Sequence, residues 1–343
     1  MGFRPTLKDV AAKSGYALRT VKKVMSGDPS VRDKTRDAVL QAAAALSYTP
    51  NRAASALGKR KQINVALVYS KPSEVYFSDL ERGFRRCAEE LFDYGLNLHD
   101  YTTAEANWQA QTAILDELLH SDIDGIILQP ISATKLDRNI NALVQSGKPV
   151  VTVGSDAPGS RRLCFVGCDA VQSGRIAGQL LAAYTGGQGK LLIVSDCSDQ
   201  EQARKRAEGL ENRLAECHPQ MAIYHPDAVE QALGHEELIQ KLVLEQKISG
   251  LFCTSGNNTI SAGKALRSLG ASQIPLIGFD LSPDSSSLLR EGWIQVLLDQ
   301  KPDIHAHQAV KILFTYLTDG AVPEAIQRLP VYLFTSECLP ASD

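Results

Sequence analysis

The chain has 343 residues, is 44% hydrophobic and 22% charged, and carries a formal net charge of −3. This composition is that of a folded protein with two or three domain cores, and it excludes an intrinsically disordered chain. No window holds the roughly 20 apolar residues needed to span a bilayer. Because the N-terminal stretch also lacks an apolar signal-peptide core, we expect a cytoplasmic protein with no membrane partner.

The charge is unevenly distributed along the chain. Residues 1–61 contain 13 Lys and Arg against four Asp and no Glu, a net charge of +9, whereas the remainder carries −12. This asymmetry indicates an anion-binding module joined to an acidic body, and nucleic acid is the usual polyanion.

Three short amphipathic helices are predicted in the basic segment. The first follows Thr6, a potential N-cap, and ends at Gly15; the others cover residues 19–26 and 33–47. Two short helices joined by a glycine-containing turn, with a third to complete a small core, form the pattern of a helix-turn-helix. The alternative is an unrelated three-helix bundle with a solvated basic face.

The order of residues in this segment separates the two interpretations. The positions that carry it are 6–11, Gly15, 20–21, Val24, Gly27, 35–36, Val39 and 48–54. Together they resemble the headpiece of the lactose/galactose repressor (LacI) family. The resemblance implies a sequence-specific regulator of transcription, a repressor of carbohydrate metabolism genes, bound to a double-stranded DNA operator.

The second helix departs from the family at three positions. Ala17 stands where the family usually has Ser, and Lys22 and Lys23 replace the Ser and Arg of the family's Thr-Val-Ser-Arg. Lys23 lacks the planar fork with which the family's Arg matches guanine. Leu18 and Arg19 match the two positions that read base edges most variably in the family, so the resemblance implies that Arg19 reads a base edge directly, with guanine as its partner. The full set of predicted DNA-binding residues is Thr6, Leu18, Arg19, Thr20, Lys22, Lys23, Asn51, Arg52, Ala54 and Leu57.

Residues 50–61 resemble the family's hinge helix, which folds on DNA and inserts a leucine into the minor groove. Leu57 matches that leucine, and an apolar wedge of this kind kinks a base step. The alternative is that Leu57 packs on the next domain. Two hinge helices at one site imply a homodimer on a near-palindromic operator.

From residue 63 onward, short apolar runs alternate with amphipathic helices. The runs are 63–69, 125–129, 149–153, 190–195, 250–254 and 276–279, and the helices are 80–91, 109–119, 136–145, 173–183, 203–216, 236–244 and 259–269. Repeated βα units predict an α/β fold with parallel sheets covered by helices on both faces. Ligands in such folds bind at the carboxyl ends of the strands.

The order of motifs in the body resembles the sensor domain of the same repressors and the periplasmic sugar-binding proteins. It implies a type I periplasmic-binding-protein domain of two Rossmann-like lobes, with the chain crossing between them near 162–168, 299–302 and 328–331. The predicted domains are a headpiece at 1–49, a hinge at 50–61 and a body at 62–343. The N-lobe comprises 62–165 and 301–329, and the C-lobe 166–300 and 330–343.

The resemblance also implies a pocket for a monosaccharide or polyol effector. Its predicted residues are Tyr76, Phe77, Gln129, Ser155, Asp156, Arg206, Asn257, Asp280 and Gln300. Aromatic faces, amides, carboxylates and an Arg fork suit the apolar and hydroxylated sides of a sugar ring. The chain has Gly154 where the family often has an Asp, so either Asp156 substitutes or the ligand differs at that point.

Two other functions compete with a DNA-binding regulator. One is a sugar-binding protein of a transport system that does not bind DNA. The other is an enzyme, which the sequence disfavours because it has no GxSxG, Walker or HExxH motif and its histidines are dispersed. We therefore expect no catalytic residues, no cofactor and no metal site, and we expect the seven cysteines to be free thiols. The effector, the sign of its action and the choice between dimer and tetramer stay open.

Overall fold

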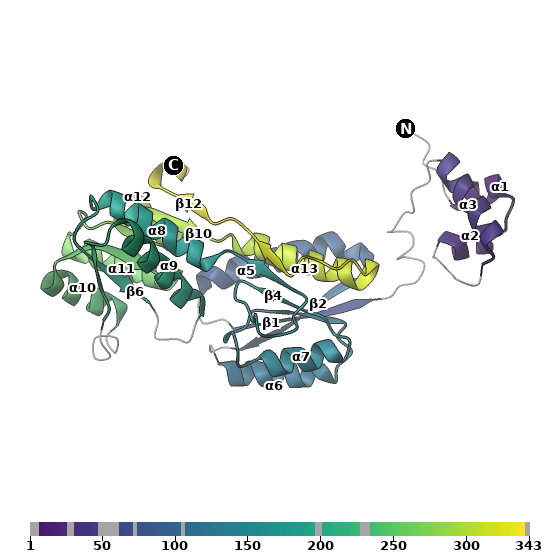
Figure 1. Ribbon diagram of the computed structural model, residues 1–343, viewed down its shortest axis with the longest axis horizontal. Coiled ribbons are helices and arrows are strands. Elements are labelled where there is room, and N and C mark those ends of the chain that lie inside the picture. The colour runs from purple at the N-terminus through teal and green to yellow at the C-terminus, as the bar shows by residue number, and fades with distance from the viewer. Residues whose placement is uncertain are drawn as a thin grey trace. The chain divides into compact units, whose positions relative to one another are not determined.

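The structure, a computed structural model, describes residues 7–25, 31–46, 62–70, 74–103, 107–195, 201–226 and 234–339. It divides into a small helical unit within residues 1–61 and a large unit made of nearly all of residues 62–343. Figure 1 labels the elements of both units along the chain.

The small unit is a three-helix headpiece. Its helices are α1 (Leu7–Ser14), α2 (Leu18–Met25) and α3 (Asp33–Ala45). Val10, Val21, Val24 and Val39 form its core together with two alanines of α3. Gly15 has a φ of +73°, a conformation that glycine adopts without strain and that lets the chain turn sharply between α1 and α2. The predicted helix-turn-helix is confirmed, with ends within two residues of the prediction where the structure describes them.

The first sheet of the large unit has six parallel strands. They are β1 (Ile63–Ser70), β2 (Leu96–Thr103), β3 (Gly125–Leu128), β4 (Val150–Val153), β5 (Cys164–Gly167) and β11 (Ile326–Arg328), in the order β11-β5-β4-β3-β1-β2. The helices that cover it are α5 (Glu74–Leu91), α6 (Trp108–Leu119), α7 (Asp137–Gln145) and α13 (Pro302–Asp319). We call this sheet and its helices the N-lobe.

The second sheet also has six strands, one of them antiparallel. They are β6 (Lys190–Val194), β7 (Ala222–Tyr224), β8 (Ile248–Cys253), β9 (Leu276–Phe279), β10 (Val296–Asp299) and β12 (Tyr332–Phe334), in the order β12-β10-β9-β8-β6-β7. Only β12 runs antiparallel, against β10. Its helices are α8 (Ala170–Tyr184), α9 (Glu201–Cys217), α10 (His235–Gln246), α11 (Gly256–Leu269) and α12 (Pro283–Arg290). This is the C-lobe.

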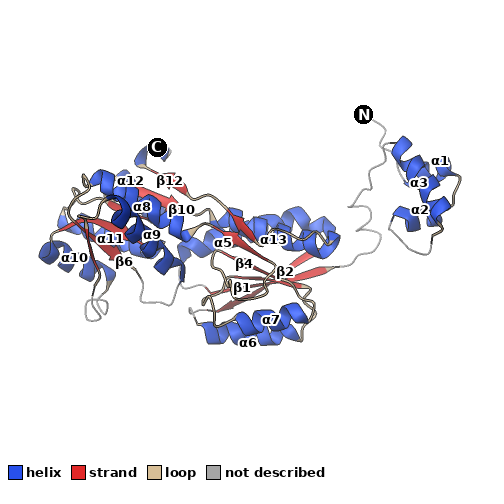
Figure 2. Ribbon diagram, viewed as in Figure 1, coloured by secondary structure: helices blue, strands red, loops and turns tan. Residues whose placement is uncertain are grey.

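Successive residues of each central strand point to opposite faces, and both faces are buried. In β1, Val65 and Leu67 pack in the cluster under α5 and α13, whereas Ala66 and Val68 pack in the cluster under α6 and α7. Figure 2 shows helices on both sides of this sheet. Burial on two faces explains why the central strands read as continuous apolar runs rather than as alternating patterns. The predicted doubly covered α/β fold is confirmed.

The chain passes between the two sheets three times: after β5, between β10 and α13, and between β11 and β12. Val166 and Gly167 still belong to β5, where Gly167 pairs with Arg328 of β11. The first crossing therefore lies two residues beyond the boundary predicted at residue 165. Among the described residues, no helix is long and apolar enough to cross a membrane.

Candidate functional site

Three of the predicted ligand residues form one hydrogen-bonded group in the C-lobe. The Gln300 amide Nε2 donates to Asp280 Oδ1 over 2.9 Å, and Arg206 Nη2 donates to Gln300 Oε1 over 2.6 Å. Asp280 and Gln300 follow directly on β9 and β10, and Arg206 lies in the helix after β6. All three side chains are buried. The carboxyl ends of neighbouring strands thus hold a carboxylate, an amide and a guanidinium in one fixed arrangement.

Two further residues position Arg206. Its Nη1 donates to the backbone oxygen of Thr254 over 2.6 Å, and its Cζ lies 3.9 Å from the ring centroid of Phe279. Burial lowers the pKa of the guanidinium, while the Asp280 carboxylate opposes this shift. The buried Nε has no hydrogen-bond partner among the described residues. Two of the five N–H groups are used in these bonds, and the Nε–H is among the donors left for a ligand. The sequence analysis did not identify Thr254 or Phe279, although both lie at the carboxyl end of an apolar run.

Asp280 has a left-handed backbone, with a φ of +64°, which Asp tolerates better than most residues. Burial raises the pKa of its carboxyl group to about 6, against the lowering effect of Arg206 and of the hydrogen bond from Gln300. The group is therefore an ionised hydrogen-bond acceptor at neutral pH. It titrates within a range in which ligand binding can be measured.

Tyr76 brings an N-lobe residue to the same place. It lies in the first turn of α5, which follows the carboxyl end of β1. Burial raises the pKa of its phenol, the Asp280 carboxylate raises it further, and Arg206 opposes the shift. The phenol of this N-lobe residue is therefore close enough to Asp280 and Arg206 of the C-lobe for their charges to act on it.

The Tyr76 hydroxyl also explains a departure from the family noted in the sequence. Gly154, directly after β4, has a φ of +71°. A β-carbon added there would overlap with the Tyr76 hydroxyl oxygen. A side chain at residue 154 and the phenol of Tyr76 therefore compete for the same space.

Phe77 does not join this group. Its ring stacks on Tyr69 with centroids 6.2 Å apart and an interplanar angle of 13°, and it is buried in the N-lobe core. It also meets the edge of the Tyr76 ring at 5.2 Å. In this structure Phe77 supports Tyr76 rather than facing the C-lobe.

Asp156 is engaged within the N-lobe. Arg162 forms a bidentate ion pair with it, from Nε to Oδ1 and from Nη2 to Oδ2, and Thr152 Oγ1 donates to Oδ1 over 2.9 Å. Arg162 also donates to the backbone oxygen of Ala325 over 2.9 Å. Both carboxylate oxygens of Asp156 thus have internal partners. The neighbouring Ser155 is half-buried, and its backbone nitrogen donates to the Val153 oxygen over 2.7 Å.

Gln129 and Asn257 follow the carboxyl ends of two other strands, β3 and β8. Gln129 follows β3, and its buried Oε1 has no partner among the described residues. Asn257 is exposed in the first turn of α11. The adjacent Asn258 is fully buried, and its side-chain amide lacks partners within the described part of the chain.

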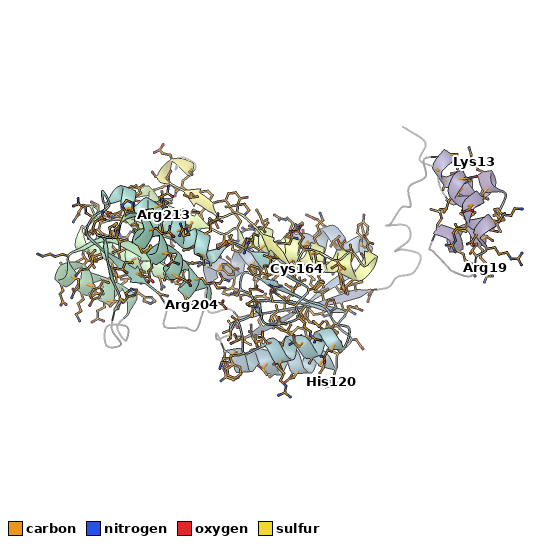
Figure 3. The ribbon with its side chains drawn as sticks, viewed as in Figure 1. Lys13, Arg19, His120, Cys164, Arg204 and Arg213 are labelled. Atoms are coloured by element: carbon orange, nitrogen blue, oxygen red, sulfur yellow. The ribbon has the colours of Figure 1, made fainter. Side chains whose placement is uncertain are left out.

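The second helix of the headpiece presents the predicted DNA-reading side chains. Arg19, Lys22 and Lys23 are exposed, whereas Leu18 and Thr20 are half-buried. Figure 3 shows the Arg19 side chain pointing away from the headpiece helices. Helix α2 therefore has an apolar inner face and a cationic outer face. The other predicted contacts, at Thr6, Asn51, Arg52, Ala54 and Leu57, lie outside the described residues.

Comparison with known families agrees with both units. Residues 6–51 match the family of bacterial regulatory proteins of the lacI type, and residues 65–321 match the periplasmic binding protein domain. The chain belongs to the periplasmic binding protein domain family and carries a lacI-family headpiece at its N-terminal end.

The similar proteins cover from 78% to 95% of this chain. Catabolite control protein A of Priestia megaterium is 25% identical over 95% of this chain and 96% of that protein. The ribose import binding protein of Escherichia coli is 24% identical over 78% of this chain and 87% of that protein. A solute-binding protein from Burkholderia graminis, solved with D-arabinose, covers 81% of this chain and 97% of its own, with a TM-score of 0.74 and 22% identity. That last likeness shows the fold alone.

The histidines and cysteines form no metal cluster among the described residues. His305 and His307, both on α13, point to different partners: His305 contacts Cys168, and His307 contacts Glu90. The cysteines that the structure describes form no disulfide with one another; they lie at positions 87, 164, 168, 217, 253 and 338. Cys197 lies outside the described residues.

Proposed function

We propose that this protein is a sequence-specific DNA-binding repressor whose affinity for its operator is set by a monosaccharide or polyol bound between the two lobes. The observation that carries the proposal is that one chain joins a headpiece with a cationic second helix to a two-lobed body. In that body Arg206, Asp280 and Gln300 are prearranged at the strand ends. The cationic helix of the headpiece is suited to DNA phosphates and bases, and the polar group in the body is suited to sugar hydroxyls.

On the DNA side, Arg19 reads a base edge, while Lys22 and Lys23 neutralise phosphates. Support comes from their exposure on the outer face of α2. The proposal extends to Thr6, Leu18 and Thr20 in the headpiece and to Asn51, Arg52, Ala54 and Leu57 in the hinge. It also includes a homodimer, because a near-palindromic operator offers two equivalent half-sites to two headpieces.

On the sugar side, Asp280 accepts hydrogen bonds from hydroxyls, and the free Nε of Arg206 donates one. Tyr76 offers a ring face and a hydroxyl from the N-lobe. Because Arg162 holds both oxygens of Asp156, the N-lobe contacts fall to uncharged groups, with Gln129 and Ser155 as further candidates. The first sugars to try are ribose and D-arabinose, because the similar proteins include a ribose import binding protein and a solute-binding protein in complex with D-arabinose.

The regulatory step follows from the two-lobed body. A sugar that binds one arrangement of the lobes more tightly shifts the population toward it, and the dimer transmits the shift to the hinges and headpieces. We propose that the sugar acts as an inducer that releases DNA. No catalytic residue, cofactor or metal enters this mechanism. Acting on an operator, the protein works in the cytoplasm.

The decisive experiment measures operator affinity with and without sugar. An operator selected from random DNA by the full-length protein is titrated by fluorescence anisotropy, alone and with each sugar that raises the unfolding temperature. A sugar at a hundred times its dissociation constant adds about 2.7 kcal/mol of stability. The proposal predicts weaker operator binding with that sugar; binding of sugars without any change in operator affinity contradicts it.

A second candidate is a transport-associated sugar-binding protein, which the likeness to the ribose import binding protein favours. The headpiece that matches the lacI family argues against it. If the transport candidate is correct, the selection from random DNA yields no operator. Arg19→Ala then changes neither DNA binding nor sugar binding.

A further inference from the structure

The thiol of Cys168 lies where the three connections between the lobes meet. Cys168 directly follows β5 and begins the first connection. Its Sγ lies 3.8 Å from the backbone oxygen of Gln300 in the second connection and 3.5 Å from that of Pro330 in the third. These residues are 132 and 162 positions away along the chain. One buried sulfur atom therefore lies at all three connections, which are the segments that must bend when the lobes change their arrangement.

His305 provides a fourth contact. Its Nε2 lies 3.5 Å from Cys168 Sγ, and it belongs to α13, which packs on the N-lobe sheet. The imidazole is fully buried, and its Nδ1 has no partner among the described residues. The thiol carries one hydrogen, so at any moment it can donate to only one of the two carbonyls or to the imidazole.

Both groups are uncharged at neutral pH. Burial raises the pKa of the Cys168 thiol to about 12, with Asp299, Asp280 and Asp169 adding to the rise and Arg206 opposing it. Burial lowers the pKa of His305 to about 4, against the effect of Asp303. A neutral thiol beside a neutral imidazole is not an activated nucleophile. The contacts of Cys168 are therefore weak, exchangeable hydrogen bonds within the connections.

Gln300 joins this junction to the sugar site. Its backbone oxygen contacts the thiol, while its side chain bonds Arg206 and Asp280. The next residue, Lys301, has a left-handed φ of +55° and pairs with Asp299 over 2.7 Å. The second connection is thus sharply bent and tied down. A movement of the Gln300 side chain can therefore shift the backbone oxygen of the same residue, which contacts the thiol.

We propose that Cys168, supported by His305, is a positioning residue of the hinge that sets the balance between lobe arrangements, and through it sugar affinity, without touching the sugar. The link to sugar affinity rests on the function proposed above; the hinge role itself does not. Weak S–H bonds with several nearby acceptors suit this role, because a moving connection can exchange one acceptor for another at small cost.

The test compares full-length Cys168→Ala with Cys164→Ala. Cys164 is a buried thiol at the start of β5, and its Sγ contacts the backbone of Phe165 in the same strand and of Gln327 in β11, both within the N-lobe sheet. Amide hydrogen exchange of the sugar-free proteins is followed by mass spectrometry. Cys168→Ala should speed exchange about fivefold or more in all three connections, near residues 168, 300 and 330. Cys164→Ala should affect β5 and its sheet neighbours alone.

Two further variants separate positioning from loss of stability. Cys168→Ser keeps a hydrogen-bond donor and should restore slow exchange in part, and His305→Gln should reproduce the effect of Cys168→Ala at the second connection. Equal exchange patterns for Cys168→Ala and Cys164→Ala, or a change confined to β5, would overturn the proposal.

Sugar affinity is then measured by calorimetry with D-ribose and D-arabinose. The proposal predicts a change of about three- to tenfold in the dissociation constant for Cys168→Ala and none for Cys164→Ala. An unchanged constant for Cys168→Ala overturns the link to affinity. If neither sugar binds the unmodified protein, the proposed ligand class is in question, whereas the exchange data still decide the hinge role.

Discussion

The hydroxyl of Tyr76 occupies the space that a β-carbon on Gly154 would need. Tyr76 comes from the start of α5 and Gly154 from the end of β4, so their fit joins two strand ends of the N-lobe at the face turned toward Asp280. At this wall of the site, the phenol of Tyr76 therefore takes the place of a side chain at residue 154.

Gly154→Ala should be destabilising for two reasons, its left-handed backbone and the overlap with Tyr76. The backbone alone costs about 1 kcal/mol, and overpacking adds roughly 1–3 kcal/mol. Gly147→Ala is the matched control, because Gly147 has a φ of +87° and nothing within 4 Å of an added β-carbon. Urea unfolding should rank Gly154→Ala below Gly147→Ala in stability. The double variant with Tyr76→Phe should recover part of the difference; equal costs for the two alanines would refute the overlap.

Sugar affinity should fall below about pH 6 because Asp280 becomes protonated there. A protonated carboxyl loses most of its capacity to accept hydroxyl donors, so affinity drops by up to roughly tenfold per pH unit. Calorimetric titration between pH 5 and pH 8 measures the effect. Asp280→Asn should bind more weakly at pH 7 and show no such dependence; a retained slope would assign the titration to another group.

The same carboxyl group should make the sugar-free protein less stable at neutral pH. Its folded-state pKa of about 6 lies above the ordinary value of 3.8. The protonated carboxyl group therefore makes its full contribution to the free energy of unfolding below pH 3.8, and this contribution is lost as the pH rises through about 6. Asp280→Asn should therefore raise the free energy of unfolding at pH 7 by roughly 1–3 kcal/mol, and by nothing at pH 3.5. Urea unfolding at the two pH values checks the sign.

Removing the Arg162 side chain should leave a poorly solvated carboxylate at Asp156. The two side chains are 8% and 14% exposed, so Arg162→Leu should destabilise the protein by roughly 2–3 kcal/mol. The control is Arg175→Leu, since Arg175 and Glu216 form a comparable pair with 36% and 52% exposure, worth less than about 1 kcal/mol. Thermal unfolding of both variants decides. A similar small loss for the two would show that Asp156 is not held by its partner.

Arg19 and Lys22 should differ in how they affect DNA binding. Arg19→Ala should cost about 1–3 kcal/mol and relax preference at a single base pair, whereas Lys22→Ala should weaken all sequences alike and reduce the salt slope by about one. Lys13 on α1, exposed and labelled on the opposite side of the headpiece from Arg19 in Figure 3, provides the control. Anisotropy titrations over several salt concentrations test this, and an Arg19→Ala variant with unchanged base preference would remove Arg19 from direct readout.

The strands that the sequence analysis identified are the apolar ones in the middle of each sheet. It did not identify β2, whose residues His99 and Asp100 are exposed at a sheet edge, nor the three-residue edge strands β7, β11 and β12. An edge strand has fewer buried positions, so its sequence carries little apolar signal. The short buried strands β5 and β10, each of which lies next to a connection between the lobes, were also missed.

The site divides in a similar way. Arg206, Asp280 and Gln300 were predicted from motifs at strand ends, and the structure brings them together. The engagement of Asp156 by Arg162 depends on a loop closing on itself, and the meeting of Cys168 with His305 joins residues 137 positions apart. Neither contact leaves a pattern in local spacing, so only the folded chain reveals them.

The three connections have a consequence for the order in which the protein is made. The N-lobe core needs Ala306, Ala309 and Val310 of α13, so the ribosome must release nearly the whole chain before that lobe can close. The headpiece core is complete by Ala43 and can fold as soon as it emerges. During synthesis, the DNA-reading unit therefore exists well before the part of the molecule that would control it.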